Sequence, residues 1–382
     1  MPSIEDLLLR NEEMMQQTFA PAVDEIDRER RFPRENIDAL GRIGLLGLLV
    51  PSDYGGASAG MPEMSRVLDQ MAQCCPSTAM VALMHYCGTA IVVSKGSAKL
   101  KQDLLPAIAR GAHLTTLAFS EAGSGGHFYS PISQLIKNGR RIALSASKSF
   151  VTSAGEADSY VVSTRSPDAK GPLDVDLYLV HKATKGLRVS GRFEGLGLAG
   201  NASAPVTLED VTLEQENRFG QEGSGFQTML EVVLPHFQIG SASVSLGIAT
   251  AAFKAATAHV LARKYEHAGG ASLAQIPRVQ FLVAEMALEL RSARAYLSET
   301  IRRVVSGNPE AMLDVLGVKA KTAETSLAVA SRAMTLGGGA AFGRRGGLER
   351  IFRDAHAASV MAPATDVLKD FLGKACLGLP LF

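Results

Sequence analysis

Residues 175–213 read VDLYLVHKATKGLRVSGRFEGLGLAGNASAPVTLEDVTL, and this stretch decides the fold class. It is built of short runs rich in β-branched residues, and Gly, Pro, Ser and Asp separate the runs as they separate strands in β proteins. The runs at 141–144 and 160–163 further upstream have the same composition. Strands that recur about every ten residues predict a β-sandwich or β-barrel in the middle of the chain.

The same stretch contains the pattern GxGxxG, as GLGLAG at 195–200. In dinucleotide-binding folds this pattern follows a strand and opens a helix, so that the pyrophosphate lies at the helix N-terminus. Here the pattern leads through Pro205 into a further β-rich run at 205–208. The context of a dinucleotide site is therefore missing, and we discard that interpretation.

On both sides of the β-rich region the apolar residues recur with a helical period. Helices are predicted around residues 35–40, 64–71, 78–93, 282–297 and 323–334, and the glycines at 337–339 are expected to end the last one. Residues 232–253 carry no charged side chain but many polar ones, which favours a buried bundle helix over a membrane span. The order is thus helical, then β, then helical.

The composition excludes several classes of function. The 382 residues include 39 Lys and Arg against 38 Asp and Glu, a net charge of +1, which argues against nucleic-acid binding. An apolar content of 46% argues against disorder. The four cysteines form no CxxC pair, so neither a metal site nor a disulfide framework is expected. The first residues lack a secretory signal, and we expect a cytoplasmic protein.

Five segments, taken in order, resemble the acyl-CoA dehydrogenase superfamily of flavoproteins. They are IGLLGLLVPSDYGG at 43–56, AFSEAGSG at 118–125, SKSFVTSAGEAD at 147–158, GLG at 195–197 with EDV at 209–211, and LGG at 336–338 with RIFRDA at 350–355. The resemblance implies an α+β fold with a helical N-terminal domain (1–113), a central β-domain (114–222) and a C-terminal four-helix bundle (223–382). It also implies a homotetramer or dimer.

The resemblance further implies FAD, or FMN in a minority branch, between the β-domain and the bundle. A flavin ring needs an apolar wall for its face and short polar groups for its edge, and Phe150 stands where the family often has a stacking Trp. The residues expected to bind the cofactor are Phe119, Ser120, Gly125, Gly126, Phe150, Val151, Thr152, Ser153, Arg263, Gly337 and Gly338. Arg263 matches a family arginine that reaches the flavin of the neighbouring subunit.

The base that such a dehydrogenation needs is absent from both places where the family carries a glutamate. Residues 361–365, after the Arg-Asp pair, contain no carboxylate, and residues 237–238 on the first bundle helix are Phe and Gln. A base must be a carboxylate or an imidazole near the substrate. The candidates that remain are Asp366, His85, Glu231 and His236.

Three functions are compatible with this pattern. The first, which we favour, is α,β-dehydrogenation of an acyl thioester in fatty acid metabolism, with hydride transfer to the flavin and an electron-accepting flavoprotein as partner. The second is a two-component monooxygenase supplied by a flavin reductase, because DFLGKACLG at 370–378 resembles the tail of that branch. The third is a degenerate subunit that binds flavin or acyl-CoA.

Overall fold

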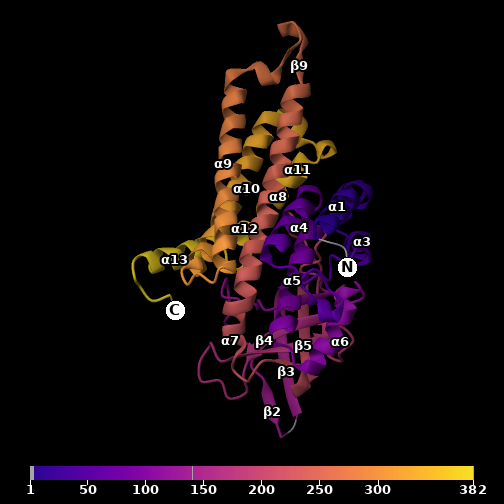
Figure 1. The fold of residues 1–382 in the computed structure, drawn as a ribbon, viewed down its shortest axis with the longest axis vertical. Helices are drawn as coiled ribbons and strands as arrows, with labels where there is room; N and C mark the ends of the chain where they lie inside the picture. Colours follow the sequence, from indigo (N-terminus) through magenta and orange to yellow (C-terminus); the bar gives the residue numbers. More distant parts are fainter. Residues whose placement is uncertain (1–3, 140, 382) are drawn as a thin grey trace.

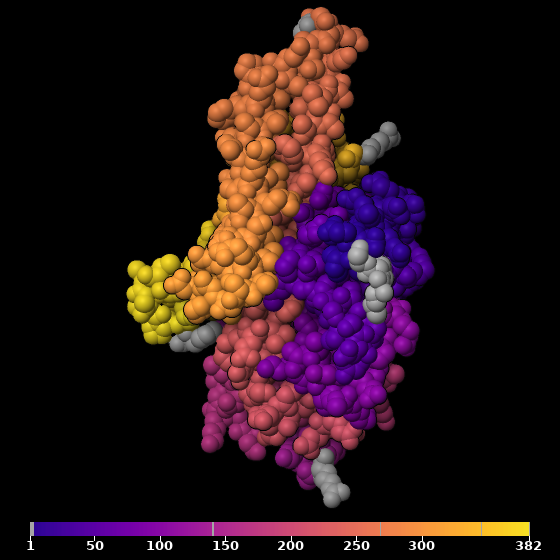
Figure 2. Space-filling model, viewed as in Figure 1, coloured from indigo at the N-terminus to yellow at the C-terminus, as the bar shows by residue number. Residues whose placement is uncertain are grey.

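The computed structural model describes residues 4–139 and 141–381. Helices come first along the chain, strands follow, and a second set of helices ends it (Figure 1). The long C-terminal helices extend away from the strands, and the N-terminal helices lie beside both (Figures 1 and 2). The α+β class and the expected succession of helical, β and helical parts are confirmed.

Six helices form the N-terminal part. They are α1 (Ile4–Met14), α2 (Ala20–Glu29), α3 (Arg34–Arg42), α4 (Met61–Cys74), α5 (Pro76–Lys95) and α6 (Ala98–Ala109). Helix α5 is buried almost all round, as its uncharged sequence predicts, and it packs against α4, α8 and β1. It therefore connects the three parts of the molecule.

Two four-stranded sheets follow. The strands are β1 (Thr115–Ala118), β2 (Ile136–Asn138), β3 (Arg141–Val151), β4 (Ser159–Arg165), β5 (Val175–His181), β6 (Leu187–Val189), β7 (Ala204–Leu213) and β8 (Arg218–Phe219). One sheet has the order β1-β4-β5-β8 and the other β2-β3-β7-β6. Among the strand pairs of the described residues, β1 and β4 alone run parallel. The runs at 205–208 and 211–213 are one strand, β7, with a register shift near Asp210, whose φ is 48°.

The C-terminal part is helical. It contains α7 (Gly225–Thr228), α8 (Leu234–Ala262), α9 (Pro277–Val305), α10 (Ala311–Phe342), α11 (Leu348–Asp354), α12 (Ala357–Val360) and α13 (Thr365–Cys376), with β9 (Lys264–Tyr265) and β10 (Ala271–Ser272) between α8 and α9. The expected helix end at residues 337–339 is confirmed in that the long helix breaks at Gly338, where φ is 52° and ψ is −141°; a short second helical stretch then continues to Phe342. Glycine permits this left-handed backbone without steric cost.

Two helical stretches, Pro76–Lys95 and Gly225–Ala262, are long and apolar enough to cross a bilayer by composition alone. Most of the apolar window of the first is buried within the protein, and half of that of the second. Burial of this kind is what core helices of a bundle require.

The GLGLAG stretch at 195–200 is a packing element. A Cβ at Gly197 would come within 2.5 Å of the Arg353 carbonyl oxygen, so only glycine lets this loop approach α11. The Leu198 amide then donates a hydrogen bond of 2.7 Å to Asp354 Oδ1. Gly197 thus lets the β-domain pack against the C-terminal helices, and no helix follows the stretch.

Candidate functional site

A cavity of about 890 Å³ lies where the β-domain, the start of α8 and the segment around α12 meet. Helix α5 adds Met80 and Met84 to its lining, and a short π-helical turn ahead of α8 adds Val233. The lining is mostly apolar. A cavity of this size and character is typical of a site for a cofactor with its substrate.

The β-domain wall contains most of the residues that the sequence assigned to a flavin. Those that line the cavity are Phe119, Ser120, Gly125, Gly126, Phe150 and Thr152. The other two from this region, Val151 and Ser153, are buried and do not line it. The loop after β1 and the end of β3 thus meet at one wall of the cavity.

The chemistry of this wall fits an isoalloxazine ring. Phe150 is 71% exposed although it is a large aromatic residue, and its ring belongs to the cavity wall. Short polar side chains lie at the same wall: Thr152 Oγ1 is 3.0 Å from Ser203 Oγ, and Asn201 is close by in the chain. A flat apolar ring with a polar edge needs this combination of a stacking partner and small hydrogen-bonding groups.

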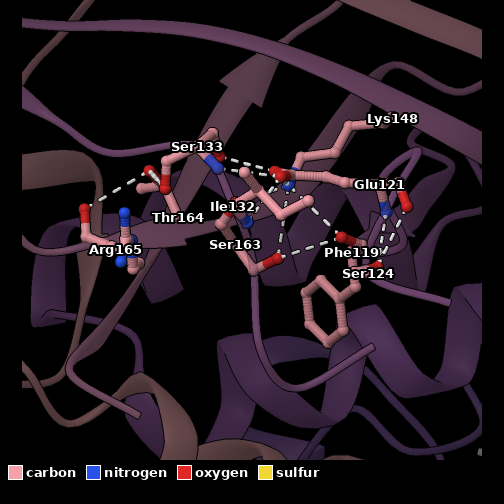
Figure 3. A network of polar contacts seen from close by, with 9 residues as sticks. All are labelled: Phe119, Glu121, Ser124, Ile132, Ser133, Lys148, Ser163, Thr164 and Arg165. Atoms are coloured by element: carbon pink, nitrogen blue, oxygen red, sulfur yellow. Dashed lines mark hydrogen bonds and ion pairs between the residues drawn. The ribbon is translucent and has the colours of Figure 1, made fainter. Parts of the chain in front are cut away.

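One buried ion pair fixes the loop that carries Phe119 and Ser120 (Figure 3). Lys148 Nζ on β3 lies 2.6 Å from Glu121 Oε1 and also donates to the carbonyl oxygen of Ser163 at 2.6 Å. Glu121 Oε2 accepts the amides of Ile132 and Ser133 at 2.7 and 2.8 Å. Every polar atom of the pair is satisfied, so both ends of the loop are held to the sheet.

The same contacts decide the charge of Glu121. Burial by itself would raise its pKa, but the Lys148 ammonium and the hydrogen bonds from Lys148 and Ser133 lower it overall. A carboxylate with a lowered pKa and no free oxygen is a poor proton acceptor. Glu121 is therefore a structural anchor, although it lies at the cavity edge.

The Arg-Asp pair joins the opposite wall to the rest of the molecule. Arg353 binds Asp27 on α2 through two hydrogen bonds of 2.9 and 2.5 Å, and Nε donates to Glu349 at 2.7 Å. Asp354 is buried, which raises its pKa to about 6, and it receives the Leu198 amide. Both residues thus position α11 against the N-terminal helices and the 195–200 loop.

A second buried lysine holds the segment beyond α12. Lys319 on α10 is fully buried, and its Nζ donates to the carbonyl oxygens of Ala358, Met361 and Pro363 at 2.9, 3.0 and 2.8 Å. Met361, Ala362 and Ala364 in this segment line the cavity. Burial lowers the pKa of Lys319 to about 7, and the three carbonyl dipoles favour its ammonium form.

The structure places the four candidate bases outside the cavity lining. His85 is buried with both ring nitrogens occupied, because Nε2 faces Leu46 O at 2.9 Å and Nδ1 accepts the Thr115 amide at 3.1 Å. Glu231 is half exposed and paired with Lys95. Asp366 is exposed on the first turn of α13, and His236 Nδ1 faces Val232 O at 2.7 Å. Their catalytic roles stay predictions, without support from the geometry.

The three remaining cofactor candidates also lie away from this lining. Arg263 is exposed at the end of α8, directly before β9, which lies at the tip of the long helices (Figure 1). Gly337 and Gly338 lie in the last turns of α10. Their role toward the cofactor stays a prediction, which in the case of Arg263 requires a neighbouring subunit.

The sequence analysis overlooked the bundle wall. Arg353, His356, Ala357 and Val360 all line the cavity and are spaced i, i+3, i+4 and i+7. This is the spacing of one helical face, so the period continues across the turn between α11 and α12. This spacing is visible in the sequence, but it lies outside residues 361–365 and 237–238, where the family carries a glutamate.

Models of three acyl-CoA dehydrogenase domains match the chain in order: the N-terminal domain at residues 5–112, the middle domain at 116–211 and the C-terminal domain at 223–377. A cyclohex-1-ene-1-carbonyl-CoA dehydrogenase of Geobacter metallireducens is 27% identical over 94% of both chains. A short-chain specific acyl-CoA dehydrogenase of Clostridium acetobutylicum is 26% identical over 94% of this chain and 93% of its own.

Among solved structures, butyryl-CoA dehydrogenase of Megasphaera elsdenii superimposes with a TM-score of 0.92 at 23% identity, over 99% of both chains, and so has the same fold. The domain matches, the similarity over nearly the full length and the flavin-compatible cavity agree with one another. The chain belongs to the acyl-CoA dehydrogenase superfamily and is an acyl-CoA dehydrogenase-like oxidoreductase.

Proposed function

We propose that this protein is an FAD-dependent dehydrogenase that introduces a double bond between the α- and β-carbons of an acyl thioester. The observation that carries the proposal is that one cavity brings together a wall suited to a flavin and the apolar segment around α12. Bound FAD supplies the hydride acceptor for the hydrogen of the β-carbon. The chain supplies the binding, the orientation and the exclusion of water.

Individual residues divide these tasks. The exposed ring of Phe150 offers a stacking face for the flavin, and the Thr152–Ser203 hydroxyl pair offers hydrogen bonds to its edge. Met80, Met84 and Phe237 provide an apolar surface for the acyl chain. An apolar, water-poor site strengthens the electrostatic interactions made there and suits the transfer of a hydride.

The relatives that are named as acyl-CoA dehydrogenases support coenzyme A as the acyl carrier. By the same analogy, an electron-transferring flavoprotein would reoxidise the flavin, and a homotetramer would bring Arg263 of one chain near the flavin of another. The proposal thus comprises the electron-transferring flavoprotein, the homotetramer, FAD in preference to FMN as the cofactor, and a role in fatty acid metabolism.

The test is an anaerobic titration. The purified protein, loaded with FAD, is mixed with straight-chain acyl-CoAs of short, medium and long chain length while the flavin absorbance is recorded. Bleaching by at least one of them, with formation of the enoyl-CoA, supports the proposal. No bleaching by any acyl-CoA, but oxygenation when reduced flavin and O₂ are supplied, would establish the monooxygenase instead.

A third result is informative as well. Failure to retain flavin in the presence of excess FAD, together with no oxygenation when reduced flavin and O₂ are supplied, would contradict both enzymatic functions and favour a degenerate subunit. Phe150→Trp serves as the control for cofactor binding, because it keeps an aromatic face at the same position and is expected to retain FAD. This control separates a poorly loaded protein from an inactive one.

A further inference from the structure

The proposed dehydrogenation needs a proton acceptor beside the substrate, and three residues of the described lining carry an ionisable or charged group. These are Glu121, Arg353 and His356. Glu121 is neutralised by Lys148 and by amide donors. Arg353 is permanently charged, and its guanidinium already binds Asp27, Glu349 and the Leu196 carbonyl. His356 is the remaining group.

The imidazole of His356 is oriented by its own helix turn. Its Nδ1 lies 2.8 Å from the carbonyl oxygen of Phe352, and its ring packs edge-on against the Phe352 ring with centroids 4.8 Å apart. A carbonyl oxygen can only accept a hydrogen bond, so Nδ1 carries a hydrogen in this contact. The neutral ring then has its lone pair on Nε2.

Nε2 of His356 makes no hydrogen bond within residues 4–139 and 141–381. His85 provides the contrast, because protein groups engage both of its nitrogens and it does not line the cavity. An imidazole with one nitrogen tied to a carbonyl and the other free at a cavity wall has the arrangement of a general base.

We infer that Nε2 of His356 accepts the α-proton of the bound acyl thioester; this role rests on the proposed function. The α C–H bond breaks, and its proton passes to Nε2 while its electron pair forms the new double bond. The hydrogen of the β-carbon leaves with its electron pair as hydride, which reduces the oxidised flavin. The imidazolium formed keeps its Nδ1–H bond to Phe352 O and later returns the proton to water.

The position of His356 also explains how the site dispenses with a glutamate. The wall segment held by Lys319 places Met361, Ala362 and Ala364 at the cavity, and none of them can accept a proton. His356 lies on the same wall, one helical turn before Val360. His356 therefore lines the same cavity as residues 361–364, although it lies about one helical turn earlier in the sequence.

The experiment compares three variants of the FAD-loaded protein with the wild type. His356→Gln keeps a polar side chain of similar length but removes the basic nitrogen. His356→Ala leaves space for added imidazole. His113→Gln is the control, because the His113 imidazole also makes a hydrogen bond, to Ser159 Oγ at 2.8 Å, but lies outside the cavity lining. Bound FAD per chain and the thermal midpoint show whether each variant is folded and loaded.

Two readouts are followed for each protein: the rate of flavin bleaching by the acyl-CoA that bleaches the wild type best, and deuterium uptake from D₂O at the acyl α-carbon. We expect His356→Gln to lower both by about 100-fold or more, as removal of a general base does. His356→Ala should regain rate in proportion to added imidazole, and His113→Gln should match the wild type.

Each contrary result has a definite meaning. Wild-type rates in a folded His356→Gln, or loss in His356→Ala without rescue by imidazole, overturn the assignment while the proposed function stands. An equal loss in His113→Gln overturns it as well. If the wild type itself neither bleaches nor exchanges with any acyl-CoA, the proposed function fails, and the role of His356 fails with it.

Discussion

The two walls of the cavity are each held by one buried lysine, but the ammonium charges of the two lysines are compensated in different ways. On the β-domain wall, Lys148 pairs with the Glu121 carboxylate, which in turn collects the amides of the loop (Figure 3). On the bundle wall, Lys319 is surrounded by three backbone carbonyls, and no salt bridge to a described carboxylate accompanies them.

The difference shows two solutions to the cost of burying an ammonium group. An ion pair recovers that cost through one strong partner, so the loss of either partner leaves an uncompensated charge. A cage of carbonyls spreads the compensation over backbone atoms that no substitution removes. The β-domain wall should therefore be the more vulnerable to mutation, and the bundle wall the more dependent on the lysine itself.

The largest effect is expected for Glu121→Gln. The substitution leaves the Lys148 ammonium buried without a counter-charge, which should lower the free energy of unfolding by about 4 kcal/mol. The double variant Glu121→Gln/Lys148→Met should be more stable than the single one, because the charge is removed as well. Urea unfolding of the wild type, the single variant and the double variant compares their free energies of unfolding. Equal stability of the single and double variants would contradict the ion-pair account.

Lys319→Met is expected to cost about 3 kcal/mol, because three carbonyl oxygens lose their donor in a buried place. The wall at 358–363 should also loosen, and its amides should exchange with solvent faster than those of the β-domain wall. Hydrogen exchange resolved by segment provides the measurement. A variant that is as stable as the wild type, with unchanged protection at 358–363, would show that the carbonyl cage holds nothing in place.

A third way to bury a titratable group is to keep it uncharged. His85 on α5, beside β1, is buried in this way. Burial lowers its pKa from 6.5 to about 4. Because the folded pKa lies below the unfolded one, the unfolded state binds more protons between these values, and stability falls as the pH falls from 6.5 to 4. The loss should reach about 2 to 3 kcal/mol in the wild type.

In His85→Gln this part of the acid sensitivity should be absent, whatever the variant costs at neutral pH. Urea unfolding at a series of pH values between 4 and 7 compares the two slopes. Parallel slopes would show that His85 is not the group responsible for this acid sensitivity.

The smallest effect on stability is expected at the exposed ring of the β-domain wall. Phe150→Ala removes a side chain that is mostly exposed, so the free energy of unfolding of the apoprotein should change by less than about 0.5 kcal/mol. Flavin affinity should nevertheless fall about tenfold or more, because the stacking face is lost, whereas Phe150→Trp should retain it. Fluorescence titration with FAD checks both. Unchanged affinity of the alanine variant would remove Phe150 from the site.

Much of the β-domain wall could be predicted because its residues lie in two continuous segments, 118–126 and 147–153. Phe119, Ser120, Phe150 and Thr152 reach the cavity as their motifs implied. Val151 does not, because successive residues of a strand point to opposite faces of the sheet. The helices were equally predictable where one face is apolar, as on α9, whose Met286, Leu290 and Leu297 are buried.

The bundle wall could not be predicted in the same way. His85 and His356 are both single histidines in helical surroundings, and their sequences alone do not show that one is enclosed by backbone groups while the other has a free nitrogen at a cavity. The distances that separate the two cases join residues far apart in the chain, such as Leu46 to His85. Periodicity describes a helix but not its neighbours.

The sequence by itself determined the order of helices and strands, the family and the two segments that form the β-domain wall of the cavity, because these follow from local periodicity and from continuous motifs. Only the tertiary structure decided which ionisable groups are neutralised and which is free. Charge and proton affinity depend on burial and on partners a few ångströms away, and folding brings Lys148 to Glu121, Lys319 to the 358–363 carbonyls and His356 to the cavity.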